Sequence, residues 1–201
     1  MRDSKIITAH FMLHWGEPSE IRPRRLPGIE KFAILEFGPT VSRKTWFYAT
    51  NGMSSYAQSR PGEGTTLRTE IYCASKERLT WVDDLLAGIA IYPRDHNTCL
   101  AATDTIRSGQ PIDQRSSPFM GVLFAPPPLA TLCVIDHLPE EVHVLQVIGL
   151  LPGETAFAKE HGGKALWSHL GKLEHHLPRR SARTGRLADR GKRGHGSLTA
   201  R

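Results

Sequence analysis

Apolar residues recur along the first 177 positions with two spacings, one typical of helices and one typical of strands. The clearest helical pattern covers residues 81–90, where apolar side chains recur at i, i+1, i+4, i+5, i+8 and i+9. Asp83 and Asp84 fall on the opposite face of this predicted helix. Pro93 is expected to end the helix, because proline lacks the N–H that a helical turn needs.

Strand-like patterns account for most of the other apolar positions. Residues 65–74 alternate between apolar and polar side chains, which predicts a strand with one buried face. Residues 142–151 are apolar on both faces apart from His143 and Gln146, so this strand should lie in a sheet that helices cover. Further strands are expected at residues 30–37, 44–50, 118–124 and 130–135.

Shorter helices are expected near both ends of the patterned region. Residues 4–15 fit a helix or a strand, and the helix is favoured because Gly16 would end it. Another helix should begin at Pro152, with an acidic residue in its first turn, and a last one should cover residues 164–173.

The remaining segments are polar or rich in proline and glycine, and they predict connections. These segments are residues 17–27, 58–64 and 94–117. The predicted fold class is therefore α/β (α+β), a mixed β-sheet flanked by helices in a single domain.

Charge divides the chain into two regions. The formal net charge is +6, but residues 178–201 hold eight basic residues and one acidic residue, whereas residues 1–177 are nearly neutral. Apolar periodicity ends at Leu177. We therefore predict a domain at residues 1–177 and a basic, disordered tail at residues 178–201.

The composition of the basic tail limits the nucleic-acid binding that we expect. Clustered arginines can bind phosphates by releasing counterions, but no aromatic residues lie between them to stack on bases. The tail equally fits a solubilising extension, so we expect at most weak nucleic-acid contact through it.

Cysteine usage and hydropathy indicate a reducing compartment. The three cysteines form no C-x-x-C pair, which argues against a disulfide framework and a cysteine-built zinc site. The N-terminus has no apolar core or cleavage site of a secretory signal, and no apolar stretch approaches the roughly 20 residues of a membrane helix. The expected location is cytoplasmic, without membrane attachment.

Several residue groups invite a catalytic or metal-binding interpretation, and each has a simpler one. Ser54 follows Gly52 as in a hydrolase elbow, but Tyr56 replaces the second glycine, so a tight turn is preferred. Glu154 fits a helix N-terminus better than a carboxylate pair with Glu140 and Glu141.

The sequence supports neither a metal site nor a nucleotide-binding site. The adjacent His175 and His176 diverge on a helix and have no cysteine nearby, so a solvated pair is preferred to a zinc site with His169. Gly62 and Gly64 match no phosphate-binding pattern. We expect no catalytic residue, no metal and no cofactor.

Six stretches occur together in an order and spacing that resemble the suppressor of fused domain. They are residues 14–18 (HWGEP), 48–54 (YATNGMS), 68–72 (RTEIY), 81–93 (WVDDLLAGIAIYP), 119–123 (FMGVL), and 150–154 (LLPGE) followed by 162–170. The T-x-G-M-S element is the most distinctive. One departure is Thr103-Asp104-Thr105-Ile106, where the family often has G-h-t-i, so contacts that need that glycine or histidine are in doubt.

This resemblance implies a mixed sheet with flanking helices and no catalytic activity. The animal member sequesters a transcription factor and has a further C-terminal domain, for which 201 residues leave no room. The short relatives are bacterial, and many resemble immunity proteins that neutralise polymorphic toxins. The resemblance therefore suggests a bacterial immunity protein that binds a cognate toxin, or alternatively an adaptor that sequesters an endogenous protein.

Two interpretations of the signature residues stay open. Asn51, Gly52, Met53, Ser54 and Glu70, together with Glu154, are candidates for partner binding through a standard protein interface or an edge strand. In the structural alternative, the T-x-G-M-S element is a turn after a central strand, and Glu70 holds it by accepting backbone N–H bonds. A hydrolase that uses Ser54 is a further alternative.

Overall fold

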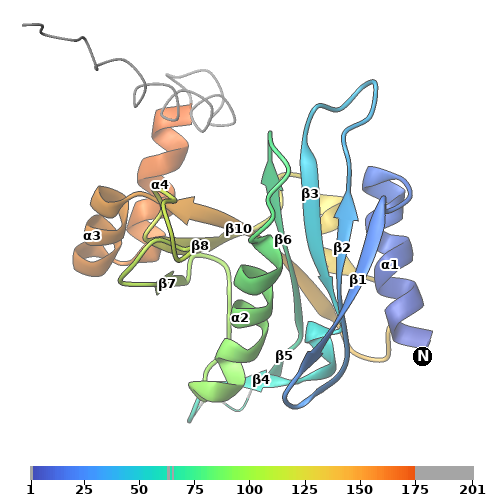
Figure 1. The fold of residues 1–201 in the computed structure, drawn as a ribbon. Coiled ribbons are helices and arrows are strands. Elements are labelled where there is room, and N and C mark those ends of the chain that lie inside the picture. The colour runs from blue at the N-terminus through green and yellow to red at the C-terminus, as the bar shows by residue number, and fades with distance from the viewer. Residues whose placement is uncertain (1, 63, 65, 175–201) are drawn as a thin grey trace, which may run out of the picture.

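A mixed β-sheet forms the centre of the fold (Figure 1). The structure is a computed structural model that describes residues 2–62, 64 and 66–174. Eight strands form this sheet in the order β1-β2-β3-β6-β10-β8-β7, with β9 paired to β10. Strand β10 runs parallel to β6 and antiparallel to β8. The strands are β1 (Glu20–Leu26), β2 (Ile29–Phe37), β3 (Trp46–Asn51), β6 (Thr69–Ser75), β7 (Thr105–Arg107), β8 (Gly121–Ala125), β9 (Val134–Ile135) and β10 (Val142–Leu150).

Helices cover both faces of the sheet. Helix α1 (Arg2–Trp15) packs on one face through Ile7, Phe11 and Trp15, and α2 (Val82–Asp95) packs on the other. Helices α3 (Pro152–His161) and α4 (Gly163–Glu174) pack beside β8 and β10 (Figure 1). The α+β prediction, a mixed sheet flanked by helices, is confirmed.

The apolar patterns predicted the interior elements correctly. The helices expected at residues 4–15, 81–90 and 164–173 are α1, α2 and α4, and α3 begins at Pro152 as predicted. Strand β10 is largely buried on both faces, also as predicted.

Two details of the interior predictions were wrong. Residues 69–73 of β6 are buried on both faces rather than one, because α1 and α2 cover opposite sides of this strand. Pro93 does not end α2, which continues to Asp95. The missing N–H of Pro93 removes one hydrogen bond of the last turn, and this single loss does not stop the chain from following the helical path to Asp95.

The sheet edges were predicted incorrectly. The expected loop at residues 17–27 contains β1, whose seven residues are mostly exposed. Pro23 is compatible with β1 because an edge strand need not donate every backbone N–H. Likewise, the expected connection at residues 94–117 contains the other edge strand, β7.

At two other places the structure has short elements where the sequence predicted a strand or a connection. The strand expected at residues 130–135 is a 3₁₀ turn, η2 (Ala130–Leu132), followed by β9. The connection at residues 58–64 begins with β4 (Gln58–Ser59), which pairs with β5 (Thr66–Leu67) in a separate two-stranded sheet. Backbone pairing in such short segments depends on tertiary contacts.

The C-terminal predictions mostly lie beyond the described region. His175, His176, the boundary at Leu177 and the basic segment 178–201 are outside the described residues. Within the part that the structure describes, no helix is long and apolar enough to cross a membrane.

Candidate functional site

Glu70 organises the turn that follows β3. Its carboxylate is fully buried at the start of β6. Oε1 accepts the backbone N–H groups of Gly52 and Ser54, each at 3.0 Å, and the Ser54 hydroxyl at 2.6 Å. Oε2 accepts the Thr50 hydroxyl at 2.6 Å. The structural interpretation of Glu70, as an acceptor of backbone N–H bonds, is confirmed.

The electrostatics of Glu70 reflect two opposing effects. Burial raises the pKa of the carboxyl, because the charged form loses its hydration. The hydrogen bonds from Ser54, Thr50 and Gly52 favour the charged form and lower the pKa. Burial is the larger effect, so the folded protein holds a proton on Glu70 more tightly than an exposed glutamate would.

Gly52 and Met53 give the turn its shape. Gly52 has a φ of 110°, and a Cβ there would lie 1.8 Å from the carbonyl oxygen of Lys31 on β2. A side chain is therefore excluded both by conformation and by space. Met53 begins a 3₁₀ turn, η1 (Met53–Ser55), and is buried in the core on the α2 side of the sheet.

Asn51 connects the end of β3 to helix α1. Its Nδ2 donates to the carbonyl oxygen of Ser4 at 3.0 Å and to Oγ1 of Thr8 at 2.8 Å. Its Oδ1 is buried and accepts no hydrogen bond within the described residues. Asn51 therefore fixes α1 on the sheet and leaves one acceptor unused.

Glu154 lies apart from the other five candidates, on α3 (Figure 1). Its carboxylate accepts the backbone N–H of Leu151 at 3.0 Å, which satisfies a donor at the start of this helix. The structure thus brings Asn51, Gly52, Met53, Ser54 and Glu70 together and separates Glu154 from them. A role of these six residues in partner binding stays a prediction.

The structure also locates the residues considered for other chemistry. Ser54 is 5% exposed, and its hydroxyl is directed to Glu70 inside the protein. His169 stacks on Phe157 with ring centroids 5.4 Å apart. Glu140 pairs with Arg68, whose guanidinium also donates to the carbonyl oxygen of Ser54 at 2.8 Å. Glu140 and Arg68 therefore brace the same turn from outside.

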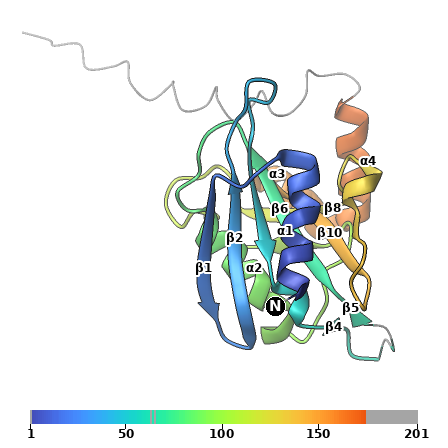
Figure 2. The ribbon, with the colours of Figure 1, turned by 90° about the vertical axis from the view of Figure 1, so that its right-hand side faces the viewer.

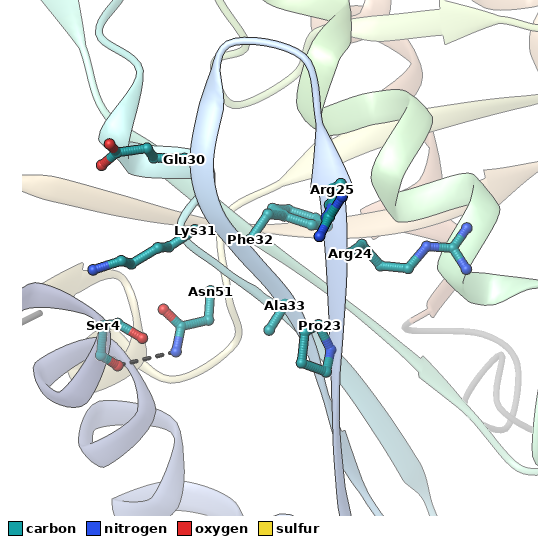
Figure 3. Close-up of a pocket in the computed structure, with 9 residues that line it drawn as sticks. All are labelled: Ser4, Pro23, Arg24, Arg25, Glu30, Lys31, Phe32, Ala33 and Asn51. Carbon is teal, nitrogen blue, oxygen red and sulfur yellow. Dashed lines mark hydrogen bonds between the residues drawn. The ribbon is translucent and has the colours of Figure 1, made fainter.

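A groove on the α1 side of the sheet was missed by the sequence analysis. This hairpin groove, of about 410 Å³, lies between α1 and the β1–β2 hairpin (Figure 3). Its lining includes Ser4 of α1, Pro23, Arg24 and Arg25 of β1, Lys31 of β2 and Asn51 of β3. Residues 21–24 alternate between apolar and polar side chains, which could have indicated this strand, but its low hydrophobicity and the register shift between Arg24 and Leu26 masked the pattern.

A second recess, of about 490 Å³, lies between the end of α2 and the start of α4. Arg60 and Asp104, which form an ion pair at 2.6 Å, are part of its lining. Thr103, at the position where the resembling family often has glycine, adopts a φ of 74°. This left-handed conformation is strained for a β-branched residue, which explains why glycine suits the position. Arg60 and Asp104 are too far apart in sequence for any pattern to have paired them.

Comparison with protein families gives one match over most of the chain. The model of the family described as Suppressor of fused protein (SUFU) matches residues 28–184. No curated protein matches the sequence.

Solved structures share the fold. The chain superposes on a suppressor of fused homolog from Neisseria gonorrhoeae FA 1090 with a TM-score of 0.68 at 15% identity, covering 86% of this chain and 91% of that one. A chain of the Sufu-Fu complex gives a TM-score of 0.63 at 18% identity, covering 83% and 82%. Drosophila Suppressor of Fused gives 0.62 at 17% identity, covering 83% of this chain and 46% of that one.

Proposed function

The chain belongs to the suppressor of fused family, and from this premise we propose that it is a non-catalytic domain that binds a protein partner. The observation that carries the proposal is the fold shared with Sufu, which the Sufu-Fu crystal structure contains in a complex. The turn after β3 supports the non-catalytic part of the proposal, because the Glu70 carboxylate is occupied by hydrogen bonds from within the protein.

The partner in this proposal is a toxin, which the protein neutralises by direct binding in the bacterial cytoplasm. Support comes from the likeness to a bacterial homolog, of which this chain covers 91%, and from the resemblance to immunity proteins of that class. No metal or cofactor takes part in this function. The body of the protein, residues 1–177, makes the interface, and the basic segment 178–201 is dispensable for it.

The candidate residues contribute to binding in different ways under this proposal. Asn51 reaches the hairpin groove and is the candidate closest to a surface that a partner can occupy. Gly52, Met53, Ser54 and Glu70 act from beneath by fixing the turn that positions Asn51. Glu154 fixes the start of α3 and contributes only if the interface extends to that helix.

Affinity capture from cells of the source organism tests this function. Tagged full-length chain and tagged residues 1–177 serve as two baits, with the tag alone as the control. We expect one stoichiometric protein on both baits. Loss of that protein from the truncated bait would contradict binding by the body, and nucleic acid released by high salt from the full-length bait alone would place the function in the basic segment.

A growth assay separates toxin neutralisation from the second candidate, sequestration of an endogenous regulator. The captured protein is expressed in a heterologous host with and without this chain. Neutralisation predicts growth arrest by the partner alone and recovery upon co-expression. A partner that is harmless by itself, and whose gene lies away from the gene of this chain, would favour the adaptor.

A further inference from the structure

The hairpin groove lies where the sheet extends beyond helix α1. Figure 2 shows β1 and β2 to one side of α1, so the helix does not cover this end of the sheet. Pro23 and Ala33 form a small, apolar part of the lining, and their strands are paired directly at these two residues. The groove, of about 410 Å³, is open to solvent and so suits a segment that lies along the surface.

Basic side chains dominate the rim of the groove. The lining carries Arg24, Arg25 and Lys31 and one acidic residue, Glu30. Arg24 turns toward α2, where it pairs with Asp84 (Figure 3). Arg25 and Lys31 are exposed, and no ion pair involves either of them in the part of the chain that the structure describes. With Arg24 paired to Asp84, these two basic residues outweigh the acidic Glu30 in the lining, and the rim keeps a positive excess.

Asn51 supplies an independent sign of a ligand. Its side chain is 4% exposed, and its Oδ1 has no hydrogen-bond donor among the described residues. Figure 3 shows the Asn51 side chain directed toward Ser4, to whose carbonyl oxygen the amide nitrogen is bonded. A buried acceptor without a donor is costly, and a ligand N–H would remove that cost once neighbouring side chains move to expose this oxygen, which has almost no accessible surface.

Strand β1 favours an extended ligand. It is the outer strand of the sheet, paired with β2 on one side only in the described structure. Its other side presents backbone groups that an extended segment can use, except at Pro23, which has no N–H. Asn51 lies on β3, with β2 and β1 between it and this free side, so an extended segment reaches the Asn51 oxygen only by crossing the α1 face of the hairpin.

We propose that the hairpin groove binds an extended acidic segment of the partner protein, with acidic side chains at Arg25 and Lys31 and a backbone N–H at Oδ1 of Asn51. This inference rests on the proposed function and deepens it. Charge excludes the chain's own C-terminal segment as the occupant, because residues 178–201 hold eight basic residues and one acidic residue. An acidic segment instead complements the rim.

A titration followed by NMR tests the groove on the isotope-labelled full chain. The probe is a synthetic peptide of alternating glutamate and serine, and the control is the same peptide with glutamine in place of glutamate. We expect the acidic peptide to shift the backbone amides of Arg25, Lys31 and Ala33 and the side-chain amide of Asn51. Equal shifts with the glutamine peptide, or shifts only at other residues, would overturn the proposal.

A charge-reversal variant of the groove and a control variant with the same change in net charge test the role of the two basic residues. The double variant Arg25→Glu/Lys31→Glu should weaken binding of the acidic peptide at least about tenfold. The control Lys76→Glu/Lys159→Glu makes the same change in net charge at exposed positions outside the groove, and it should bind like the wild type. Salt should weaken binding to the wild type, because the Debye length falls from about 10 Å at 0.1 M to about 3 Å at 1 M.

The same variants separate this proposal from the proposed function. If the captured partner is retained by the control and lost by Arg25→Glu/Lys31→Glu, the groove is its binding surface. If both variants retain the partner equally, the groove proposal fails and the proposed function stands. If the wild type captures no partner, the proposed function fails, and the peptide titration alone then decides the groove.

Discussion

Glu70 is a buried carboxyl group that accepts hydrogen bonds from two backbone N–H groups and two hydroxyl groups. Its role as an acceptor of backbone N–H bonds was one of the two interpretations that the family resemblance left open, and the hydrogen bonds bear it out. The bond between Asn51 and helix α1 had no such basis, since Ser4 and Thr8 precede Asn51 by more than 40 residues. Local hydrogen bonds can be inferred from neighbouring residues, whereas bonds between distant elements require the fold.

The raised pKa of Glu70 predicts a pH dependence of stability. The folded state holds the proton more tightly than the unfolded state, so this residue's contribution is full below the unfolded pKa and is lost as the pH rises through the folded pKa. Glu70→Gln removes the titration. Its amide nitrogen can donate to Oγ1 of Thr50, whose hydroxyl can turn to the Ile71 carbonyl oxygen 3.3 Å away.

Urea unfolding of both proteins measures this effect. The free energy of unfolding of the wild type, relative to Glu70→Gln, should fall as the pH rises from about 4 to about 8. A difference that is constant or increases over that interval would show that the pKa of Glu70 is not raised in the folded state.

Gly52 gives a sharper test of the turn. Gly52→Ala should lower the free energy of unfolding by at least about 2 kcal/mol, because its Cβ would overlap the Lys31 carbonyl at a φ of 110°. Gly88→Ala is the matched control, since Gly88 is exposed within α2 and its Cβ would meet no atom within 4 Å. The control should raise stability by about 0.5–1 kcal/mol. Equal effects of the two changes would refute the close approach at Gly52.

Among the elements, the helices and inner strands were predictable and the edges were not. Helix α2 buries a continuous apolar stripe, so its periodicity is visible in the sequence. Strand β1 reads EIRPRRL, and besides its backbone pairing with β2 and the contact of Leu26 with the core it is held by ion pairs. These ion pairs join Arg22 of β1 to Glu36 of β2 and Asp83 of α2. No local sequence pattern links the three residues.

Arg22 is the main polar connection between β1 and α2. It donates to Asp83 at 2.7 Å and to the buried Glu36 at 2.6 Å, and these partners raise its pKa above the ordinary range. Arg22→Met should cost about 2 kcal/mol of unfolding free energy, because it leaves a buried carboxylate with fewer donors. Asp84→Asn breaks the exposed pair with Arg24 and should leave stability near that of the wild type. Thermal or urea unfolding compares the two, and a similar loss in both would contradict the assigned role of Arg22.

At the scale of the whole molecule, the ordered set of short motifs was more informative than any single one. Each motif corresponds to an element that builds the sheet or its cover, including the turn at residues 51–54 and helix α2. The motifs therefore predicted the family and the fold. The hairpin groove is formed by α1, β1, β2 and β3 together, so its lining could be found only from the structure.

Isothermal titration calorimetry of the full chain with its captured partner tests the central proposal, non-catalytic binding to a protein, most directly. The proposal predicts a saturable isotherm with a fixed stoichiometry, after which further injections release only heat of dilution. A steady heat flow that persists after each injection would indicate turnover of the partner by this chain. Either that result or the absence of any binding heat at several temperatures would contradict the proposed function.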